Sequence, residues 1–379
     1  MKLIHLSDLH IGKRVNDYSM IDDQAYILKE ILTIIDSTTP DGVIIAGDVY
    51  DKSVPSAEAV SLLDDFLVKL SKRGLPVFII SGNHDSCERL AFASRLIEGS
   101  GIHISPVYNG NVEPITLKDE NGEVCVYMLP FVKPIHVHRV FDDESINSYT
   151  DALRVAIEHM EIDKSKRNVL ITHQFVTGAS RTESEELSVG GTDNVDASVF
   201  DDFDYVALGH IHRPQNCVGE RIRYSGTPLK YSFSEVNDKK SVTVVELGKK
   251  GELCVDTIPL TPMRDMVEIR GKYEEITLKS FYDGTSYTQD YVHITLTDED
   301  DIVDAIGKLR AIYHNLMRLD YDNARTRSSA SLDGVEDVER KSPEELFAQL
   351  YEEQNGSGLS DSQLELLRKL IEKVWEGEK

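Results

Sequence analysis

The sequence of 379 residues is poor in cysteine and contains a single tryptophan. Its four cysteines are widely separated and form no Cys-x-x-Cys pair. This spacing excludes a disulfide-stapled scaffold, argues against a thiolate zinc site and suits a reducing cytoplasm. Long hydrophobic runs are also missing, since no apolar stretch approaches the roughly 18 residues that span a bilayer, and the N-terminal residues do not resemble a secretion signal. We therefore expect a cytoplasmic protein with no membrane partner.

Two common phosphate-binding motifs are absent as well. Neither G-x-x-x-x-G-K-[ST] nor G-x-G-x-x-G occurs, which argues against nucleotide binding by those routes. Positive charge is scarce, because 41 Lys and Arg stand against 66 Asp and Glu and leave a formal net charge of -25. Bulk charge therefore does not favour adhesion to nucleic acid or to an anionic membrane. An anionic substrate would have to be held by local groups.

The hydrophobic pattern predicts a layered α/β domain. Short runs rich in Ile and Val alternate with segments of helical periodicity, and this rhythm is typical of sheets whose faces are covered by helices. The predicted helices are residues 25–35 and 57–70. The predicted strands are residues 3–6, 43–46, 77–80, 124–129, 169–171, 205–208, 242–247 and 253–258.

The pattern changes after residue 262, where a second and smaller domain is predicted at residues 263–322. We expect strands at 266–270 and 291–296 and a helix at 302–319 within it. Residues 323–342 are polar and are interpreted as a linker. The remaining residues, 343–379, form a tail with two amphipathic helical patterns, at 343–354 and 361–375. These helices are too short to be stable alone, so they either pack on the body or bind a partner's helices.

Polar side chains follow five of the predicted strands, at the point where each strand ends. In an open α/β sheet, ligands bind outside the carboxyl ends of the strands, so these loops are expected to converge on one crevice. The side chains at the five ends are Asp8 and His10; Asp48 and Asp51; Asn83, His84 and Asp85; His173; and His210 and His212.

The residue types in these loops suit divalent metal ions. Carboxylate, carboxamide and imidazole groups without any thiolate favour Mn, Fe or Zn over copper(I) or an iron–sulfur cluster. The competing interpretation, that all are structural residues, must explain five coincidences, because buried Asp and His are disfavoured without partners. Seven candidate ligands fit two ions about 3.5–4 Å apart that share one carboxylate.

The ordered motifs resemble the calcineurin-like metallophosphoesterase superfamily. The segments HLSDLHIGK, AGDVYD, SGNHDS, THQFV, LGHIHRPQ and YSGTPLKYSFSE are similar to those of the SbcD nucleases of bacterial SbcCD complexes, which work with a coiled-coil ABC-type ATPase. The resemblance implies a layered β-sandwich flanked by helices, with a small α+β capping domain and a C-terminal helical tail. It makes residues 1–262 the nuclease domain, 263–322 a capping or DNA-binding domain, and 343–379 the partner-binding tail.

The resemblance also implies a role for each candidate residue. Asp8, His10 and His212 would hold the first metal, Asn83, His173 and His210 the second, and Asp48 would bridge the two. His84 would be the catalytic imidazole. Asp51 is favoured as the residue that orients its ring, with Asp85 as the structural alternative. Basic residues near the motifs are candidate DNA contacts, although each could equally be an ordinary solvated charge; they are Lys13, Arg14 and Arg89, followed by Arg181, Arg213 and Lys230.

The activity implied by the resemblance is a two-metal DNA phosphodiesterase with manganese as the favoured metal. It would act as an ATP-dependent double-strand exonuclease and single-strand endonuclease in DNA repair, recombination and replication. Its partners would be DNA, an SbcC-like coiled-coil ATPase and a second copy of the chain, so that a homodimer lies within a heterotetramer. Two alternatives stay open: a calcineurin-like phosphatase or small-molecule phosphodiesterase, and a non-catalytic interaction subunit on the same fold.

Overall fold

The computed structural model describes most of the chain up to residue 323 and a few residues of the tail. The described residues are 1–182, 185, 193–300, 302–323, 326, 347–348, 350–351, 359–360, 362–367 and 370. Their contacts divide the chain into one unit of residues 1–270, 274–295 and 304–320 and another of residues 271–273, 296–303 and 321–379. Most of the predicted linker and of the two predicted tail helices lies outside the described residues, although residues 362–367 are helical.

The first unit is built around two six-stranded mixed sheets. In the first sheet the strand order is β16-β15-β1-β4-β5-β6. The strands β1, β4, β5 and β6 are parallel to one another, β15 is antiparallel to β1, and β16 is antiparallel to β15. Its strands are β1 (Lys2–Leu6), β4 (Gly42–Ala46), β5 (Val77–Ile80), β6 (Ile102–Ile104), β15 (Ser241–Leu247) and β16 (Leu253–Pro259). Three of the five loops with candidate ligands follow β1, β4 and β5.

The second sheet carries the other two loops. Its order is β13-β14-β12-β9-β8-β7, in which β14, β12, β9 and β8 run parallel and the edge strands β13 and β7 run antiparallel to their neighbours. The strands are β7 (Ile115–Asp119), β8 (Gly122–Met128), β9 (Arg167–His173), β12 (Tyr205–Gly209), β13 (Gln215–Val218) and β14 (Ile222–Tyr224). The candidate ligands therefore divide between two sheets instead of lying along the edge of one.

An apolar layer joins the two sheets face to face. Fully buried side chains from both sheets, such as Ile44 and Phe78 of the first and Val169 and Ala207 of the second, form one cluster. Because side chains alternate between the faces of a strand, the neighbouring residues point outward to the helical layers. The arrangement is a β-sandwich, with sheet-to-sheet packing as the centre of the core.

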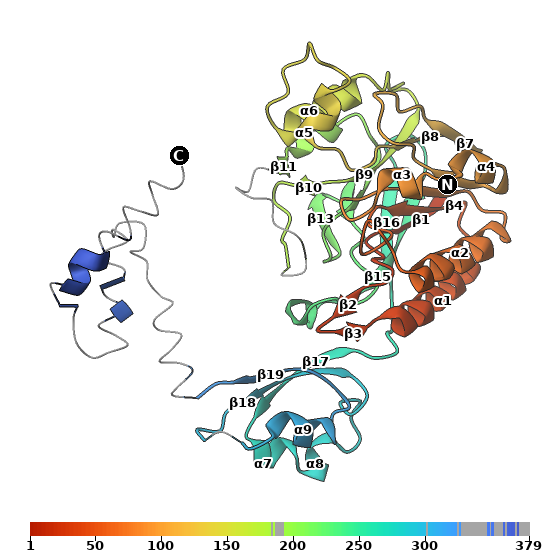
Figure 1. Ribbon diagram of the computed structural model, residues 1–379. Coiled ribbons are helices and arrows are strands. Elements are labelled where there is room, and N and C mark those ends of the chain that lie inside the picture. Colours follow the sequence, from red (N-terminus) through yellow and green to blue (C-terminus); the bar gives the residue numbers. More distant parts are fainter. Residues whose placement is uncertain are drawn as a thin grey trace. The chain divides into compact units, whose positions relative to one another are not determined.

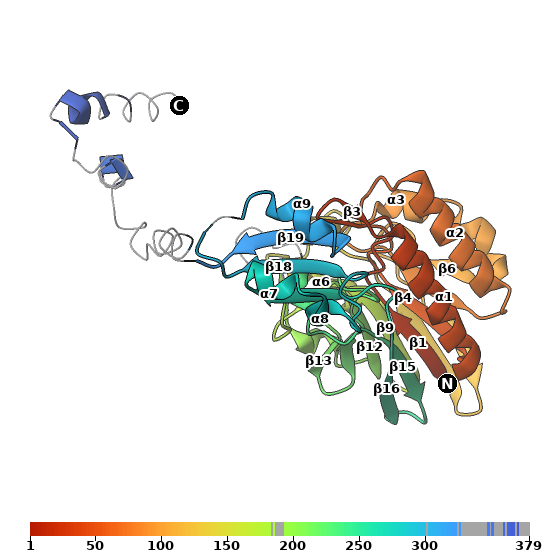
Figure 2. The ribbon, with the colours of Figure 1, turned by 90° about the horizontal axis from the view of Figure 1, so that it is seen from below.

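Helices cover both outer faces of the sandwich. The helices α1 (Ile21–Thr38) and α2 (Ala57–Ser71) lie side by side against the first sheet (Figures 1 and 2). On the second sheet lie α5 (Pro134–His138), α6 (Tyr149–Glu158) and the 3-10 turn η2 (Ala197–Phe200). This architecture confirms the predicted layered β-sandwich flanked by helices.

Short elements fill the connecting loops. The helical ones are α3 (Cys87–Leu90), α4 (Ser94–Ile97), η1 (Glu98–Ser100) and η3 (Phe233–Glu235). The extended ones are β2 (Arg14–Val15), β3 (Tyr18–Ser19), β10 (Phe175–Val176) and β11 (Asn194–Val195). No described helix has the length and apolar character needed to cross a bilayer.

A three-stranded sheet follows the sandwich in the chain. It has the order β17-β18-β19, with β17 (Met266–Gly271), β18 (Tyr291–Leu296) and β19 (Asn315–Tyr321), and short helices α7 (Tyr273–Ile276), α8 (Lys279–Tyr282) and α9 (Ala305–Arg310). The predicted helix over 302–319 is wrong, because only α9 is helical and the chain then extends into β19. Pairing with β18 outweighs the local helical periodicity of these residues, which is a weak preference by comparison.

The sandwich requires a very close approach between its sheets near the predicted site. A Cβ atom added to Gly209 at the end of β12 would lie 1.8 Å from the carbonyl oxygen of Ala46 at the end of β4. We expect Gly209→Ala to lower the free energy of unfolding by about 2 kcal/mol or more, because the new methyl group would overlap the main-chain carbonyl of Ala46 and the two strands would have to move apart. Urea denaturation measures this loss. Gly99→Ala is the matched control, since its Cβ meets nothing within 4 Å, and equal stabilities of the two variants would contradict the prediction.

Candidate metal centre

The candidate ligands lie at the carboxyl ends of strands from both sheets. Asp8 and His10 follow β1, Asp48 follows β4, Asn83 follows β5, His173 ends β9, and His210 and His212 follow β12. Because these strands are parallel within each sheet, their ends share one rim of the sandwich. The loops from the two sheets therefore meet across the top of the apolar layer, as the sequence pattern predicted.

The first group of candidate ligands contains Asp8, His10 and His212. One ligand atom from each of these residues lies within 4.8 Å of the others, and all three side chains are buried. The Nε2 atoms of His10 and His212 face each other at 3.2 Å. Ligand atoms that surround one ion at about 2.0–2.2 Å are themselves about 3–3.5 Å apart. This group thus has the spacing of a cation site.

The second group contains Asn83, His173 and His210. The side-chain oxygen Oδ1 of Asn83 lies 3.0 Å from His173 Nε2 and 3.0 Å from His210 Nδ1. His173 Nδ1 lies 2.9 Å from the carbonyl oxygen of Ala46. Because a carbonyl only accepts, Nδ1 donates, and Nε2 is the ring atom that faces the site and would bind a metal once it has lost its proton.

Asp48 lies between the two groups. Its Oδ2 atom is 3.3 Å from His173 Nε2 and 3.7 Å from His10 Nε2, and the side chain is only 2% exposed. Its other oxygen, Oδ1, accepts a hydrogen bond of 2.9 Å from the backbone N–H of His84. The carboxylate thus faces imidazoles of both groups.

The backbone of the ligand loops is held in an uncommon conformation. Asp8, His10, Asp48 and His210 all have positive φ, at 51°, 44°, 47° and 103°. Positive φ is rare in residues other than glycine and costs free energy. It persists where the surrounding structure imposes it, and such positions cluster at functional sites. Main-chain hydrogen bonds from Asp8 N to Gly47 O (3.0 Å) and from His10 N to Asp48 O (2.9 Å) join the loops after β1 and β4.

The electrostatics of the site also fit cations. Burial raises the pKa of Asp8 to about 6, and burial together with the neighbouring His173 lowers the pKa of His210 to about 3. Burial would lower the pKa of His173 too, but the facing Asp48 carboxylate outweighs it and raises the value to about 9. The same contact holds the pKa of Asp48 well below its usual value, although burial opposes this shift. Buried carboxylates and imidazoles a few ångströms apart are the kind of ligand atoms that bind divalent ions.

The predicted catalytic residue His84 lies beside this centre. Its ring is 4.9 Å from that of His10, and its Nδ1 atom lies 3.1 Å from the main-chain carbonyl of Asp51. The carboxylate of Asp51 points elsewhere, to Lys13 Nζ at 2.8 Å and to His10 Nδ1 at 3.7 Å. Asp51 therefore contacts the His84 ring through its backbone and the His10 ring through its side chain.

The alternative orienting residue, Asp85, has a structural environment. Its carboxylate accepts hydrogen bonds from the backbone N–H groups of Val49, Tyr50 and Gly82, at 2.9–3.1 Å. Burial raises the pKa of Asp85 to about 6. The side chain thus ties the loop after β4 to the loop after β5, a structural task that is separate from the orientation of the His84 ring.

The basic residues proposed for DNA contact differ in their surroundings. Lys13 is paired with Asp51 inside the rim, Arg14 is exposed and donates to the carbonyl of Asp17, and Arg89 is exposed on α3. The three further candidates are each paired with a carboxylate at 2.7–2.8 Å: Arg181 with Asp193, Arg213 with Asp238 and Lys230 with Asp265. Arg14 and Arg89 therefore present the most accessible charge of this set.

Sequence reasoning missed a layer of polar side chains beneath the first ligand group. Gln24 donates to the carbonyl of His10, Tyr231 donates to the carbonyl of Leu9, and Glu235 faces His212. Burial would raise the pKa of Glu235, but His212 and the buried Lys240 lower it to about 2. The signal was present in YSGTPLKYSFSE, a polar segment that supplies none of the predicted ligands.

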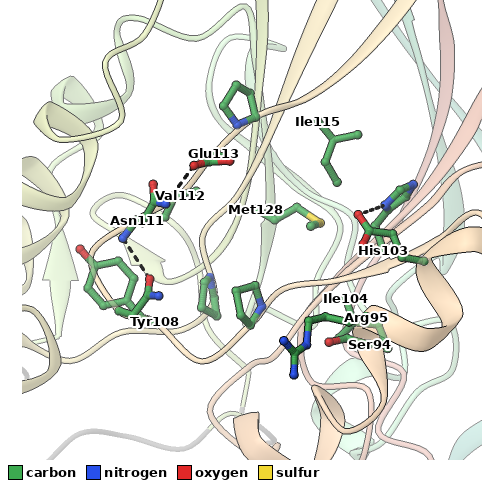
Figure 3. Close-up of a pocket in the computed structure, with 15 residues that line it drawn as sticks. Ser94, Arg95, His103, Ile104, Tyr108, Asn111, Val112, Glu113, Ile115 and Met128 are labelled. Atoms are coloured by element: carbon green, nitrogen blue, oxygen red, sulfur yellow. Dashed lines mark hydrogen bonds and ion pairs between the residues drawn. The ribbon is translucent and has the colours of Figure 1, made fainter.

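The described chain also contains a cavity that is separate from these ligands. It has a volume of about 510 Å³ and is lined by residues of α4, β6, the loop after β6, and the strands β7 and β8, among them His103, Tyr108 and Met128 (Figure 3). None of the seven candidate ligands lines it. The cavity is therefore not part of the candidate metal centre.

The raised pKa of His173 predicts proton release on metal binding. At pH 8 a group with a pKa of about 9 is mostly protonated, and it must lose that proton to become a ligand, so about one proton should leave per protein. Calorimetric titration of metal-free protein with Mn²⁺ in two buffers of different ionisation enthalpy measures this number. Release should shrink at pH 10, where His173 is already neutral, and identical heats in both buffers at pH 8 would contradict the assignment.

The chain is similar to several known proteins. A family described as calcineurin-like phosphoesterase matches residues 1–214, and one described as type 5 capsule protein repressor C-terminal domain matches residues 262–355. A Staphylococcus epidermidis protein, named as the D subunit of the nuclease SbcCD, is 34% identical over 375 residues, 98% of this chain and 98% of that protein. Its counterpart in Staphylococcus saprophyticus is 33% identical over the same shares. Among solved structures, a dimetal phosphatase from Danio rerio has a TM-score of 0.40 at 12% identity, covering 69% of this chain and 98% of that one.

The family match covers all the loops that carry the candidate ligands, and the identity to the relatives extends along the whole chain. Both are consistent with metal-binding residue types at the rim. Buried carboxylate and imidazole side chains that could hold metal ions lie close together at the rim, within the residues that the family matches. The chain is a metal-dependent hydrolase, a nuclease or phosphoesterase, with a donor set for divalent ions. It belongs to the calcineurin-like phosphoesterase family, in the group of the SbcD nucleases.

Proposed function

We propose that this chain is a two-metal DNA phosphodiesterase. The observation that supports this most strongly is the position of Asp48 Oδ2, 3.3 Å from His173 and 3.7 Å from His10, between the two ligand groups. A carboxylate in that place can be shared by two ions, which is the arrangement used for in-line phosphoryl transfer. Asp8, His10 and His212 would hold one ion, and Asn83, His173 and His210 the other.

The residues of the chain have distinct tasks in this proposal. When bound, two divalent ions supply an activated water nucleophile and neutralise charge on the phosphoryl oxygens. The protein fixes the ligand atoms in buried, hydrogen-bonded loops, so little reorganisation is needed when charge develops in the transition state. Manganese is the favoured metal, because oxygen and imidazole ligands without thiolate suit it.

His84 is proposed as the catalytic imidazole. Its Nδ1 atom faces the carbonyl of Asp51, which can only accept, so Nδ1 carries a proton and Nε2 is the atom that exchanges a proton with the substrate. A protonated Nε2 would stabilise the pentacovalent phosphorus and donate to the leaving oxygen. Asp51 positions the ring through its backbone, and its carboxylate holds Lys13 beside His10.

The proposed substrate is DNA and the proposed partner is a coiled-coil ATPase of the SbcC type. The relatives are named as the D subunit of the nuclease SbcCD, which supports a nucleic-acid substrate and a partner subunit, and the family resemblance implies that these are DNA and the ATPase. In this proposal residues 1–262 form the nuclease domain, 263–322 cap it and contact DNA, and 343–379 engage the ATPase beyond the linker 323–342. Arg14, Arg89 and Lys13 are the proposed phosphate contacts, and Lys13 is the one whose partner, Asp51, also lies beside the candidate ligand His10. The complex would act in DNA repair, recombination and replication in the cytoplasm.

A homodimer is part of the same proposal. Two large apolar side chains that follow the ligand loop after β5, Phe92 and Leu96, are 81% and 85% exposed. Exposed aromatic and aliphatic side chains that lie close together on one short segment are typical of an interface. A second copy of the chain is the proposed occupant, since the resemblance implies a dimer through the phosphoesterase domain.

The proposed activity predicts manganese-dependent cleavage of DNA. Purified protein with labelled duplex and single-stranded DNA should cut both when Mn²⁺, ATP and the ATPase partner are present, and chelation should abolish the reaction. Asp48→Asn should abolish it too, because the shared ligand loses its charge. Cleavage of an aryl phosphodiester with no cleavage of either DNA would instead favour a small-molecule phosphodiesterase. Unchanged DNA cleavage by Asp48→Asn would leave the chain as a non-catalytic subunit.

In the same assay, His84→Gln should separate chemistry from metal binding. The variant should lower kcat by about 10²- to 10⁴-fold, the usual contribution of a general acid, while elemental analysis finds the same metal content as in the wild type. Arg89→Gln is the control on a neighbouring exposed residue, and it should change affinity for DNA more than kcat. Loss of metal in His84→Gln, in step with the loss of activity, would make His84 a ligand instead.

The proposed dimer should depend on the exposed apolar pair. Phe92→Ser with Leu96→Ser should shift the protein to a monomer in sedimentation velocity, because the dimer is stabilised by burying both apolar side chains away from water. Val60→Ser on α2, where the side chain is 45% exposed, should leave the mass unchanged. A double variant that sediments as a dimer would place the interface on another face.

A further inference from the structure

Residues 225–235 bring polar side chains to the loops of the first ligand group. The Ser225 hydroxyl donates to Ser7 Oγ at 2.8 Å, and Ser7 in turn donates to the carboxylate of Asp8. The backbone N–H of Thr227 donates to the carbonyl of His212 at 3.1 Å. This part of the segment therefore contacts His212 directly and Asp8 through Ser7.

The next part of the segment holds the loop that carries His10. The Tyr231 hydroxyl donates to the carbonyl of Leu9 at 2.7 Å. Gln24 of α1 donates to the same hydroxyl at 2.9 Å and to the carbonyl of His10 at 2.8 Å, and its Oε1 accepts from Gly12 N at 2.9 Å. His10 has positive φ, so these bonds fix a conformation that the residue would not hold unaided.

Glu235 ends the segment directly behind His212. Its side chain is 0% exposed, and Oε1 lies 3.6 Å from His212 Nδ1. The other oxygen, Oε2, lies 2.5 Å from Nζ of Lys240, which is 4% exposed and also donates to the carbonyl of His212 at 2.8 Å. The buried pair thus contacts His212 through both its ring and its backbone.

The electric field of this carboxylate selects one form of the His212 ring. A negative charge beside Nδ1 favours the tautomer with its proton on Nδ1, which leaves the lone pair on Nε2. Nε2 is the atom that faces His10 Nε2 at 3.2 Å in the first ligand group. In the second group the corresponding support for His173 is a main-chain carbonyl, that of Ala46.

A purely structural role explains this buried pair poorly. Two buried charges cost desolvation, and apolar residues of similar volume are often as stable in their place. Glu235 and Lys240 nevertheless both converge on one candidate ligand. Carboxylates behind ligating histidines orient the ring and raise its basicity, and their loss commonly weakens metal binding by about 10- to 100-fold.

We propose that Glu235, neutralised by Lys240, is a positioning residue that presents Nε2 of His212 to the first of the two metal ions and thereby sets the affinity of that site alone. This inference rests on the proposed two-metal function. In this inference the segment 225–235 supports the ligands of the first ion only. The imidazoles of the two sites are then oriented by different groups.

Two double variants test the acceptor role with the buried charges removed from both. Glu235→Leu with Lys240→Met removes the acceptor next to His212, whereas Glu235→Gln with Lys240→Met retains an acceptor oxygen. Urea unfolding should give the two variants similar stabilities, because each replaces the ion pair by uncharged groups. Calorimetric titration of the metal-free full-length proteins with Mn²⁺ then measures the number of ions and the affinity of each.

We expect the Leu variant to bind one ion about 10- to 100-fold more weakly and the other unchanged, while the Gln variant binds both within about threefold of the wild type. Equal Mn²⁺ affinities in the Leu variant, the Gln variant and the wild type would overturn the inference and leave the two-metal function intact. Equal losses in both variants would also overturn it, since the ion pair and not the acceptor would then matter. A wild type that binds fewer than two ions would remove the proposed function and this inference together.

Discussion

The close approach of the two sheets at the ends of β4, β9 and β12 is the constraint on which the rest of the structure depends. Gly209 leaves no room for a side chain against the carbonyl of Ala46, and that same carbonyl accepts from His173 Nδ1. A single backbone group of the first sheet therefore contacts the ring of a candidate ligand, His173, in the second. Wider separation of the sheets would remove this bond and would carry Asp48 away from His173, so the apolar layer beneath and the polar centre above are parts of one arrangement.

The charge of the chain is compatible with an anionic substrate because the site is local. The net charge of -25 repels phosphates at long range, but salt screens exposed charges beyond about 8–10 Å. Two divalent ions would add about four positive charges at the rim. Several surface cations are already paired with carboxylates, as with Arg213 and Asp238, and contribute little to binding DNA. Affinity is thus expected to depend on the ions, on a few accessible arginines and on a partner that raises the local concentration of DNA.

Much of this fold and site could be predicted because the relevant signals are local. A buried parallel strand is a short apolar run, and a polar residue just beyond it lies at the rim, so the placement of Asp8, Asp48 and His173 follows from the order of residues alone. Whether those strands form one sheet or two depends on pairings between distant segments, for which only the family resemblance gave a guide. The end of the small sheet was mispredicted for the same reason, since β19 looks helical until β18 is beside it.

The layer behind the ligands was the hardest part to predict, and the reason is physical. A metal ligand must be one of a few residue types, whereas a group that orients it needs only a lone pair or a proton at the right distance. Three candidate imidazoles accordingly have different neighbours at Nδ1: a carbonyl at 2.9 Å for His173, the Asp51 carboxylate at 3.7 Å for His10 and the Glu235 carboxylate at 3.6 Å for His212. A carbonyl dipole polarises a ring less than a buried carboxylate does, because it carries only a partial charge. His10 and His212 would therefore donate more strongly to an ion than His173, and this asymmetry would add to the difference between the Asp8 carboxylate of the first group and the Asn83 carboxamide of the second.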